Sequence, residues 1–127
     1  MNDYRVIRVE KGGYRRLSPT DTLMQHREHV SWLEKELSAH QGKTAIITHH
    51  APHPGGLMEA DAELVAAYAS DLSPLMEKYE PELWLHGHAH KSRSLKIHNT
   101  EIQNVSLGYP EKDMAPNERL WELIYDF

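Results

Sequence analysis

The chain has 127 residues, of which 39% are hydrophobic and 26% are charged, and its formal net charge at pH 7 is −5. This size and composition predict one globular domain over residues 1–127 and exclude a low-complexity or disordered chain. Lysine and arginine are scattered, which argues against a nucleic-acid backbone or an anionic membrane as partner, and the absence of cysteine excludes disulfide and thiolate chemistry.

The first predicted elements are a short strand and a long helix. Residues 3–9 have a strand-like composition, and Gly12-Gly13 then interrupts regular structure. Ser18-Pro19-Thr20-Asp21 predicts a helix start, because serine can cap, proline fits the first helical position, and an acid three residues after the cap completes a capping box. Apolar residues follow at helical spacing as far as Leu37, so we expect an amphipathic helix that packs on an apolar surface and stops near Gly42.

Two short apolar runs, each followed by histidines, come next. Residues 44–48 lack alternation, which is typical of a strand buried on both faces of an α/β sheet. The loop after this strand reads His49-His50-Ala51-Pro52-His53-Pro54-Gly55-Gly56. A helical region over residues 59–79, divided at Ser73-Pro74, leads to a second buried strand at residues 83–85, and this strand opens into His86-Gly87-His88-Ala89-His90.

The rest of the chain is predicted to form strands at residues 94–98, 101–106 and 120–125. Strands and helices in this order predict a layered α/β sandwich built on a mixed sheet. No signal peptide or membrane-spanning segment is predicted, so we expect a cytoplasmic protein.

The histidines are the unusual feature, since the chain has ten of them. Open α/β sheets place their sites beyond the carboxyl ends of strands, where loops can aim several side chains at one point. Imidazole nitrogens suit zinc, iron or manganese, so the two histidine loops predict a transition-metal site. We expect Gly87 to turn the backbone sharply, so that His88 and His90 approach a metal ion; the plainer alternative is a glycine turn with solvated histidines.

The two histidine-bearing segments also resemble a known family. Residues 45–52, read together with residues 84–90, are similar to the last two motifs of the calcineurin-like metallophosphoesterases, and the resemblance covers nearly all of the chain. It implies the second half of a four-layer α/β sandwich and metal-dependent hydrolysis of phosphate mono- or diesters. In that family a binuclear centre of manganese, iron or zinc would be bound by His49 and His88 at one ion and by His90 at the other. His49 is preferred over His50 because the family usually places the ligand first in the pair.

The remaining candidate residues have weaker roles in this interpretation. Supporting or substrate-contacting positions are assigned to four residues, namely His50, His53, His86 and Tyr109. His53 and His86 are expected to support the site or to lie exposed. The other histidines, His26, His29, His40 and His98, are expected at the surface, and the tryptophans Trp32, Trp84 and Trp121 in the core.

The chain departs from the family in one respect. The Asp-x-His, Gly-Asp and Gly-Asn-His motifs of the family's first half do not occur. We therefore expect the chain to be a C-terminal portion of such a domain, with one or no bound ion and little activity alone. Its expected partners are a phosphate-ester substrate and either a second copy of the chain, in a homodimer, or a missing N-terminal half. The alternative is a non-enzymatic metal-binding or interaction domain. A third interpretation, a three-histidine zinc hydrolase of unrelated fold, is disfavoured because Lys91 stands where a metallo-β-lactamase motif would have aspartate.

Overall fold

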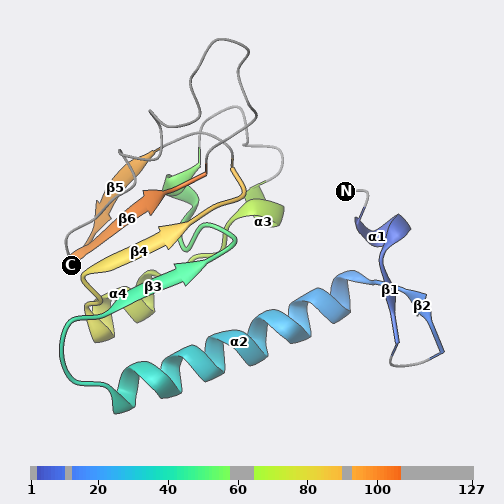
Figure 1. Cartoon of the computed structure of the whole chain (residues 1–127), viewed down its shortest axis with the longest axis horizontal. Coiled ribbons are helices and arrows are strands. Elements are labelled where there is room, and N and C mark those ends of the chain that lie inside the picture. Colours follow the sequence, from blue (N-terminus) through green and yellow to red (C-terminus); the bar gives the residue numbers. More distant parts are fainter. Residues whose placement is uncertain (1–2, 11–12, 58–64, 90–92, 107–127) are drawn as a thin grey trace, which may run out of the picture. The chain divides into compact units, whose positions relative to one another are not determined.

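The structure of the protein is a computed structural model that describes residues 3–10, 13–57, 65–89 and 93–106. It divides into two compact units, residues 1–41 and residues 42–127, each of which is described by itself (Figure 1). The expectation of a single domain over residues 1–127 stays a prediction.

The first unit begins with a helical turn rather than a strand. Helix α1 (Asp3–Val6) precedes β1 (Arg8–Val9), which pairs in antiparallel fashion with β2 (Arg15–Arg16). The prediction of a strand over residues 3–9 is therefore wrong for its first half. The reason is local, because the amide of Ile7 donates to the carbonyl of Asp3 at 2.8 Å and closes a helical turn before the strand begins.

Helix α2 (Pro19–Ala39) starts where the capping signal predicts. Ser18 is the N-cap, its hydroxyl accepts from the amide of Asp21, and the Asp21 carboxylate accepts from the amide of Ser18 at 2.8 Å. Arg15 also donates to both carboxylate oxygens of Asp21, at 2.6 and 2.5 Å. These hydrogen bonds, first from Arg15 and then from Ser18, hold the pKa of Asp21 well below its ordinary value.

The apolar stripe of α2 is only partly buried, because Leu23 is 47% exposed and Val30 and Leu33 are half-buried. Leu37 is its buried residue, whereas Trp32 is 62% exposed. The prediction that Trp32 fills a core is therefore wrong. Trp84 is fully buried as predicted, and Trp121 lies outside the described residues.

The second unit is built on a four-stranded mixed sheet with the order β3-β4-β6-β5 (Figure 1). Its strands are β3 (Ala45–Thr48), β4 (Leu83–His86), β5 (Ser94–Ile97) and β6 (Thr100–Asn104). Strands β3, β4 and β6 are parallel neighbours, and β5 is antiparallel to β6. The layered α/β fold and its mixed sheet are confirmed; the strand predicted at residues 120–125 lies outside the described residues.

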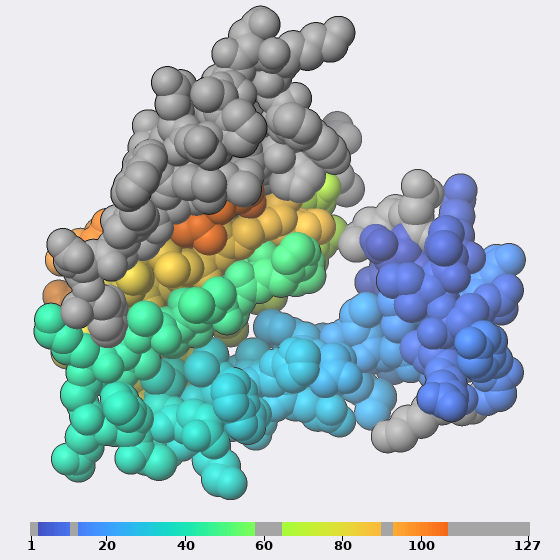
Figure 2. Space-filling model, in the orientation of Figure 1, coloured from blue at the N-terminus to red at the C-terminus, as the bar shows by residue number. Residues whose placement is uncertain are grey.

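One face of this sheet carries the core. Ile46, Trp84 and Ile102 are aligned across β3, β4 and β6, and all three are buried. Ile47, on the alternate face of β3, is 76% exposed, so the prediction of a strand buried on both faces is wrong. The physical reason is that this face of β3 is left uncovered at Ile47, and β3 has β4 as its one neighbour among the described strands. Figure 2 accordingly shows atoms of β3 at the molecular surface beside those of β4.

The described part of the connection from β3 to β4 contains three short helical elements: the 3₁₀ turn η1 (Pro54–Gly56), α3 (Val65–Tyr68) and α4 (Ser73–Tyr79). Helix α4 starts at Ser73-Pro74 as predicted and contributes the buried Leu75 and Met76. It ends at Glu80, whose left-handed φ of 47° turns the chain toward β4. Among the described helices, none is long and apolar enough to cross a bilayer.

Candidate metal site

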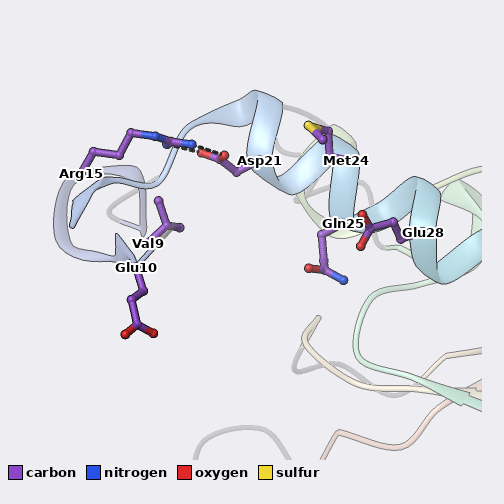
Figure 3. A pocket seen from close by; sticks show the side chains of 7 residues that line it. All are labelled: Val9, Glu10, Arg15, Asp21, Met24, Gln25 and Glu28. Carbon is purple, nitrogen blue, oxygen red and sulfur yellow. Dashed lines mark hydrogen bonds and ion pairs between the residues drawn. The ribbon is translucent and has the colours of Figure 1, made fainter. Parts of the chain in front are cut away.

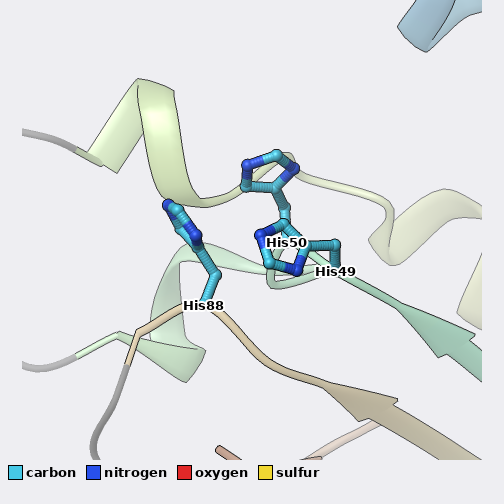
Figure 4. A group of neighbouring side chains, drawn as sticks. All are labelled: His49, His50 and His88. Carbon is cyan, nitrogen blue, oxygen red and sulfur yellow. The ribbon is translucent and has the colours of Figure 1, made fainter. Parts of the chain in front are cut away.

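Three histidines from two loops converge beyond the carboxyl ends of β3 and β4. His49 and His50 follow β3, and His88 lies two residues after β4. The two strands are parallel, with Thr48 aligned with His86, so their loops leave the same edge of the sheet. One ligand nitrogen from each of the three histidines lies within 4.8 Å of the others (Figure 4). Their ring centroids are separated by 4.7 to 5.0 Å.

The side chains of both His49 and His50 approach His88. In an extended strand, neighbouring side chains point to opposite faces. The chain bends at His49 and His50, so both rings face His88 (Figure 4). The structure thus brings His50 as close to His88 as it brings His49, with centroid separations of 4.8 and 4.7 Å.

Hydrogen bonds from inside the sheet fix the first histidine loop. The buried Trp84 donates its indole N–H to the hydroxyl of Thr48 at 3.0 Å, and this hydroxyl donates to the carbonyl of His50 at 2.7 Å. The amide of Gly87 donates to the carbonyl of His49 at 3.1 Å and so joins the two loops. Preorganised backbone of this kind reduces the entropy lost when a ligand is bound.

The sharp turn in the second loop is centred on His88. Its φ is 65°, in the left-handed region, and the amide of Ala89 donates to the carbonyl of Gly87 at 2.8 Å. A three-residue turn with positive φ at its centre is rare and strained, and it costs a non-glycine residue roughly 1–2 kcal/mol. The expectation that Gly87 makes this turn is therefore wrong, since the positive φ falls on His88. Strain at a side chain that faces two other histidines is typical of functional sites.

The three histidines fit a transition-metal ion. A tetrahedral zinc ion with Zn–N bonds of about 2.1 Å brings its ligand nitrogens to about 3.4 Å from one another. His49 and His50 are exposed and His88 is half-buried, so ring rotations can close the remaining distance. Within the described residues this group contains no carboxylate. The set therefore suits one ion with open coordination positions, whereas the bridging group that a binuclear centre needs is not among the described residues.

The other residues predicted to belong to the site have different surroundings from the three histidines. His86 is fully buried, so it is a core residue and not an exposed one. Its Nδ1 lies 3.1 Å from the carbonyl oxygen of Gly87, and burial lowers its pKa. His53 is half-buried and its Nδ1 accepts from the amide of Gly55 at 3.0 Å, which caps η1. His90 and Tyr109 lie outside the described residues.

The surface histidines follow the prediction closely. His29, His40 and His98 are exposed, and His26 is partly exposed. His29 shares a 2.8 Å hydrogen bond with Gln25 on α2. None of the four belongs to the group of three histidines that can hold an ion.

Polar side chains continue beneath the histidine loops, at the carboxyl ends of β4 and β6. His86 is aligned with Asn104, and the Oδ1 of Asn104 accepts from the amide of Ser106 at 2.9 Å. Three buried atoms here, the His86 Nε2, the Asn104 Nδ2 and the Ser106 Oγ, have no hydrogen-bond partner among the residues that the structure describes. Such groups inside a fold are normally paired, and their concentration here distinguishes this end of the sheet as a polar site.

One residue that sequence reasoning did not single out touches the histidines. The ring of Tyr68, at the end of α3, lies with its centroid 4.3 Å from that of His88 and with a tilt of 44°. No spacing rule could have found it, because the contact joins two segments that are far apart in the chain.

A second hollow lies within the first unit, between the β1–β2 hairpin and the start of α2 (Figure 3). Its polar lining includes Glu10, Asp21 and Glu28, and Arg15 neutralises Asp21. This hollow has no histidine among its lining residues, and it offers no metal-binding group comparable to the histidine site.

The fold has a counterpart among solved structures, although no protein-family model and no curated protein matches the sequence. It is similar to the crystal structure of phosphopantetheinyl hydrolase (PptH) from Mycobacterium tuberculosis, with a TM-score of 0.57 and 17% sequence identity. The match covers 86% of this chain and 40% of that chain, so this protein spans less than half of the length of its neighbour. At this identity, the likeness establishes the fold alone.

Proposed function

We propose that this chain carries metal-binding histidines of a metal-dependent phosphoesterase of the calcineurin-like kind, which hydrolyses phosphate mono- or diesters. One observation carries the proposal: the ligand nitrogens of His49, His50 and His88 converge beyond the carboxyl ends of two parallel strands. The fold likeness to a hydrolase supports it, as do the motifs that contain these histidines.

The protein's own residues would hold and orient the reacting groups. His49 and His88, with His50 beside them, would bind the ion, and the hydrogen bonds from Thr48 and Gly87 keep their loops in place. A bound transition-metal ion supplies Lewis-acid chemistry that activates water and neutralises the charge that develops on the phosphate. The open side of the cluster, where His49 and His50 are exposed, leaves room for a substrate phosphate.

Little turnover by the chain alone is part of the proposal. The described histidine group contains no carboxylate, and the sequence has none of the Asp-x-His, Gly-Asp or Gly-Asn-His motifs. A second polypeptide, either another copy or an N-terminal half, would complete the site. A cytoplasmic location agrees with the absence of cysteine and remains part of the proposal.

The second candidate function is a non-enzymatic metal-binding domain. The same observation that limits catalysis favours it, because three imidazoles without a carboxylate can bind an ion and yet lack the groups that assist hydrolysis.

The test is a manganese-supplemented phosphatase and phosphodiesterase assay on aryl phosphates, with zinc affinity measured in parallel. A phosphopantetheinyl phosphodiester belongs in the substrate panel because the structural neighbour is a phosphopantetheinyl hydrolase. The variants are His49→Ala, His50→Ala, His88→Ala and His90→Ala, and the matched control is His29→Ala on the exposed side of α2.

Metal-dependent turnover that the site variants abolish and His29→Ala retains would support the enzyme. Metal binding that the variants abolish, without turnover even after an N-terminal half is added, would favour the binding domain. No metal binding by the unmodified protein would reject both candidates.

A further inference from the structure

The second histidine loop needs support from outside itself. His88 occupies the left-handed region at φ 65°, where a side chain with a Cβ is strained. The hydrogen bond from Ala89 to Gly87 fixes the backbone of this turn, whereas the orientation of the imidazole depends on the rings that it contacts. A ligand ring that is already held in its binding orientation loses less entropy when the metal binds, and this raises the affinity.

Tyr68 is placed to supply that support. Its carbonyl accepts from the amide of Ala51 at 2.9 Å, and the amide of Ser70 donates to the carbonyl of Ala51 at 3.1 Å. These two bonds form a short parallel bridge that ties the end of α3 to the loop directly after His49 and His50. Tyr68 is therefore anchored by its backbone to one histidine loop while its ring contacts the histidine of the other.

The ring of Tyr68 is also anchored on its apolar side. Ala51, Leu57 and Ala89 form a buried cluster, with exposures between 2% and 8%, and Tyr68 packs against it. Ala89 is the residue next to His88, so this cluster lies directly under the strained turn. The tyrosine thus connects a rigid apolar base to the imidazole of His88, whose ring centroid is 4.3 Å away.

We propose that Tyr68 is a positioning residue of the metal site, whose aromatic ring holds the His88 imidazole in its metal-binding orientation. This inference rests on the proposed function and deepens it, because it concerns the affinity of that same site for its ion. The proposal assigns this role to the ring rather than to the phenol hydroxyl, because the two ring centroids are 4.3 Å apart. Groups that orient a metal ligand typically change the affinity by about 10- to 100-fold when they are removed.

The experiment measures zinc affinity of the full chain by competition with a chromogenic chelator, and it compares Tyr68→Phe with Tyr68→Leu. Phenylalanine keeps the ring, so its affinity should stay within about twofold, whereas leucine should weaken binding by about tenfold. The matched control is Tyr79→Leu, the same change on α4, which lies outside the histidine group. If the far-ultraviolet circular dichroism shows that Tyr68→Leu does not fold, Tyr68→Met is used in its place. Methionine also removes the ring, and its side chain is apolar and unbranched.

A second readout uses the metal-free protein. The ring-proton NMR signals of His88 should move in Tyr68→Leu and remain near their original positions in Tyr68→Phe, because an adjacent aromatic ring shifts the resonances of the imidazole. Unchanged zinc affinity in both Tyr68→Leu and Tyr68→Met would overturn the inference, as would an equal loss in Tyr68→Phe, which would assign the effect to the hydroxyl.

Failure of the proposed function gives a different result. If the unmodified protein binds no zinc, the proposed metal site is wrong and the role of Tyr68 in metal binding falls with it, whatever the NMR signals show. If the unmodified protein binds zinc and only the effect of Tyr68 is missing, the metal site stands and the inference alone is wrong.

Discussion

The amide of Gly87 donates a 3.1 Å hydrogen bond to the carbonyl oxygen of His49. This bond links the loop after β3 to the loop after β4 by backbone alone, just beyond the last aligned pair of the two strands, Thr48 and His86. The separation of His49 from His88 is therefore set by an extension of the sheet's hydrogen bonding. A metal site built in this way should respond to changes in that backbone even where no ligand is altered.

Gly87→Pro should weaken zinc binding, because proline has no N–H to donate to His49. The loss of one such hydrogen bond, worth about 1 kcal/mol, corresponds to about a fivefold weaker affinity. Gly87→Ala is the control: its Cβ would lie 3.7 Å from Ser106 Oγ and 3.8 Å from the His49 carbonyl, which is ordinary contact, so affinity should hold. Equal affinity for all three proteins in a chelator competition would contradict a role for this bond.

Gly56→Ala should destabilise the second unit. A Cβ at this position would lie 3.2 Å from Nε2 of the fully buried His86 and 3.5 Å from the side chain of Ala51. Because the imidazole has little room to move, overpacking should lower the free energy of unfolding by about 1–3 kcal/mol. Urea unfolding, with Gly87→Ala as the control for adding one methyl group, measures the effect. A midpoint unchanged from the original protein would show that His86 can shift at no cost.

The start of α2 should be sensitive to acid. Hydrogen bonds from Arg15 and Ser18 lower the pKa of Asp21 below its ordinary value of 3.8 in the folded chain. The folded state then binds fewer protons than the unfolded state, so the stabilisation is complete above the ordinary pKa and is lost as the pH falls below it toward the folded value. Helical circular dichroism followed from about pH 5 to about pH 2 should show this loss. Asp21→Asn, which has no titrating carboxyl, should show a smaller change over the same range, and an identical acid transition in both proteins would contradict the assignment.

The edge strand β3 should promote self-association. We propose that two copies pair through this strand, because β3 and the preceding Thr44, read as Thr44-Ala45-Ile46-Ile47-Thr48, carry no charge and are nearly symmetric about Ile46 when paired antiparallel with themselves. Ile47 is 76% exposed, so Ile47→Lys should shift the protein toward monomer in sedimentation velocity. Ser94→Lys adds the same charge to the exposed start of the opposite edge strand, β5, and should leave association unchanged. A monomeric unmodified protein would reject the pairing.

Several features were predictable because they depend on residues that are neighbours in the sequence. Ser18 caps α2 because its hydroxyl and the Asp21 carboxylate are three residues apart, which is the spacing a helix brings together. Pro74 marks the start of α4 for a similar reason, since its fixed φ fits a first helical turn. Two apolar runs that each end in histidines predicted two strands of an α/β sheet with a site beyond their carboxyl ends, and the structure has these strands as parallel neighbours.

Other features depend on contacts between distant segments, and only the tertiary structure decided them. Strand β3 lies at the edge of the described sheet and its Ile47 is exposed, while His86 is buried against Gly56. The three-residue turn is centred on His88 and not on Gly87, whose amide donates to the His49 carbonyl of the neighbouring loop.

Some residues of the candidate site were likewise predictable from local sequence, and others were decided by the tertiary structure. The sequence by itself determined that histidines gather at two strand ends, since that follows from local pattern. The tertiary structure decided that His50 joins His49 and His88, and that Tyr68 packs against them, because side-chain direction and long-range contact depend on how loops bend after the sheet has formed. No periodicity in the chain encodes that bend.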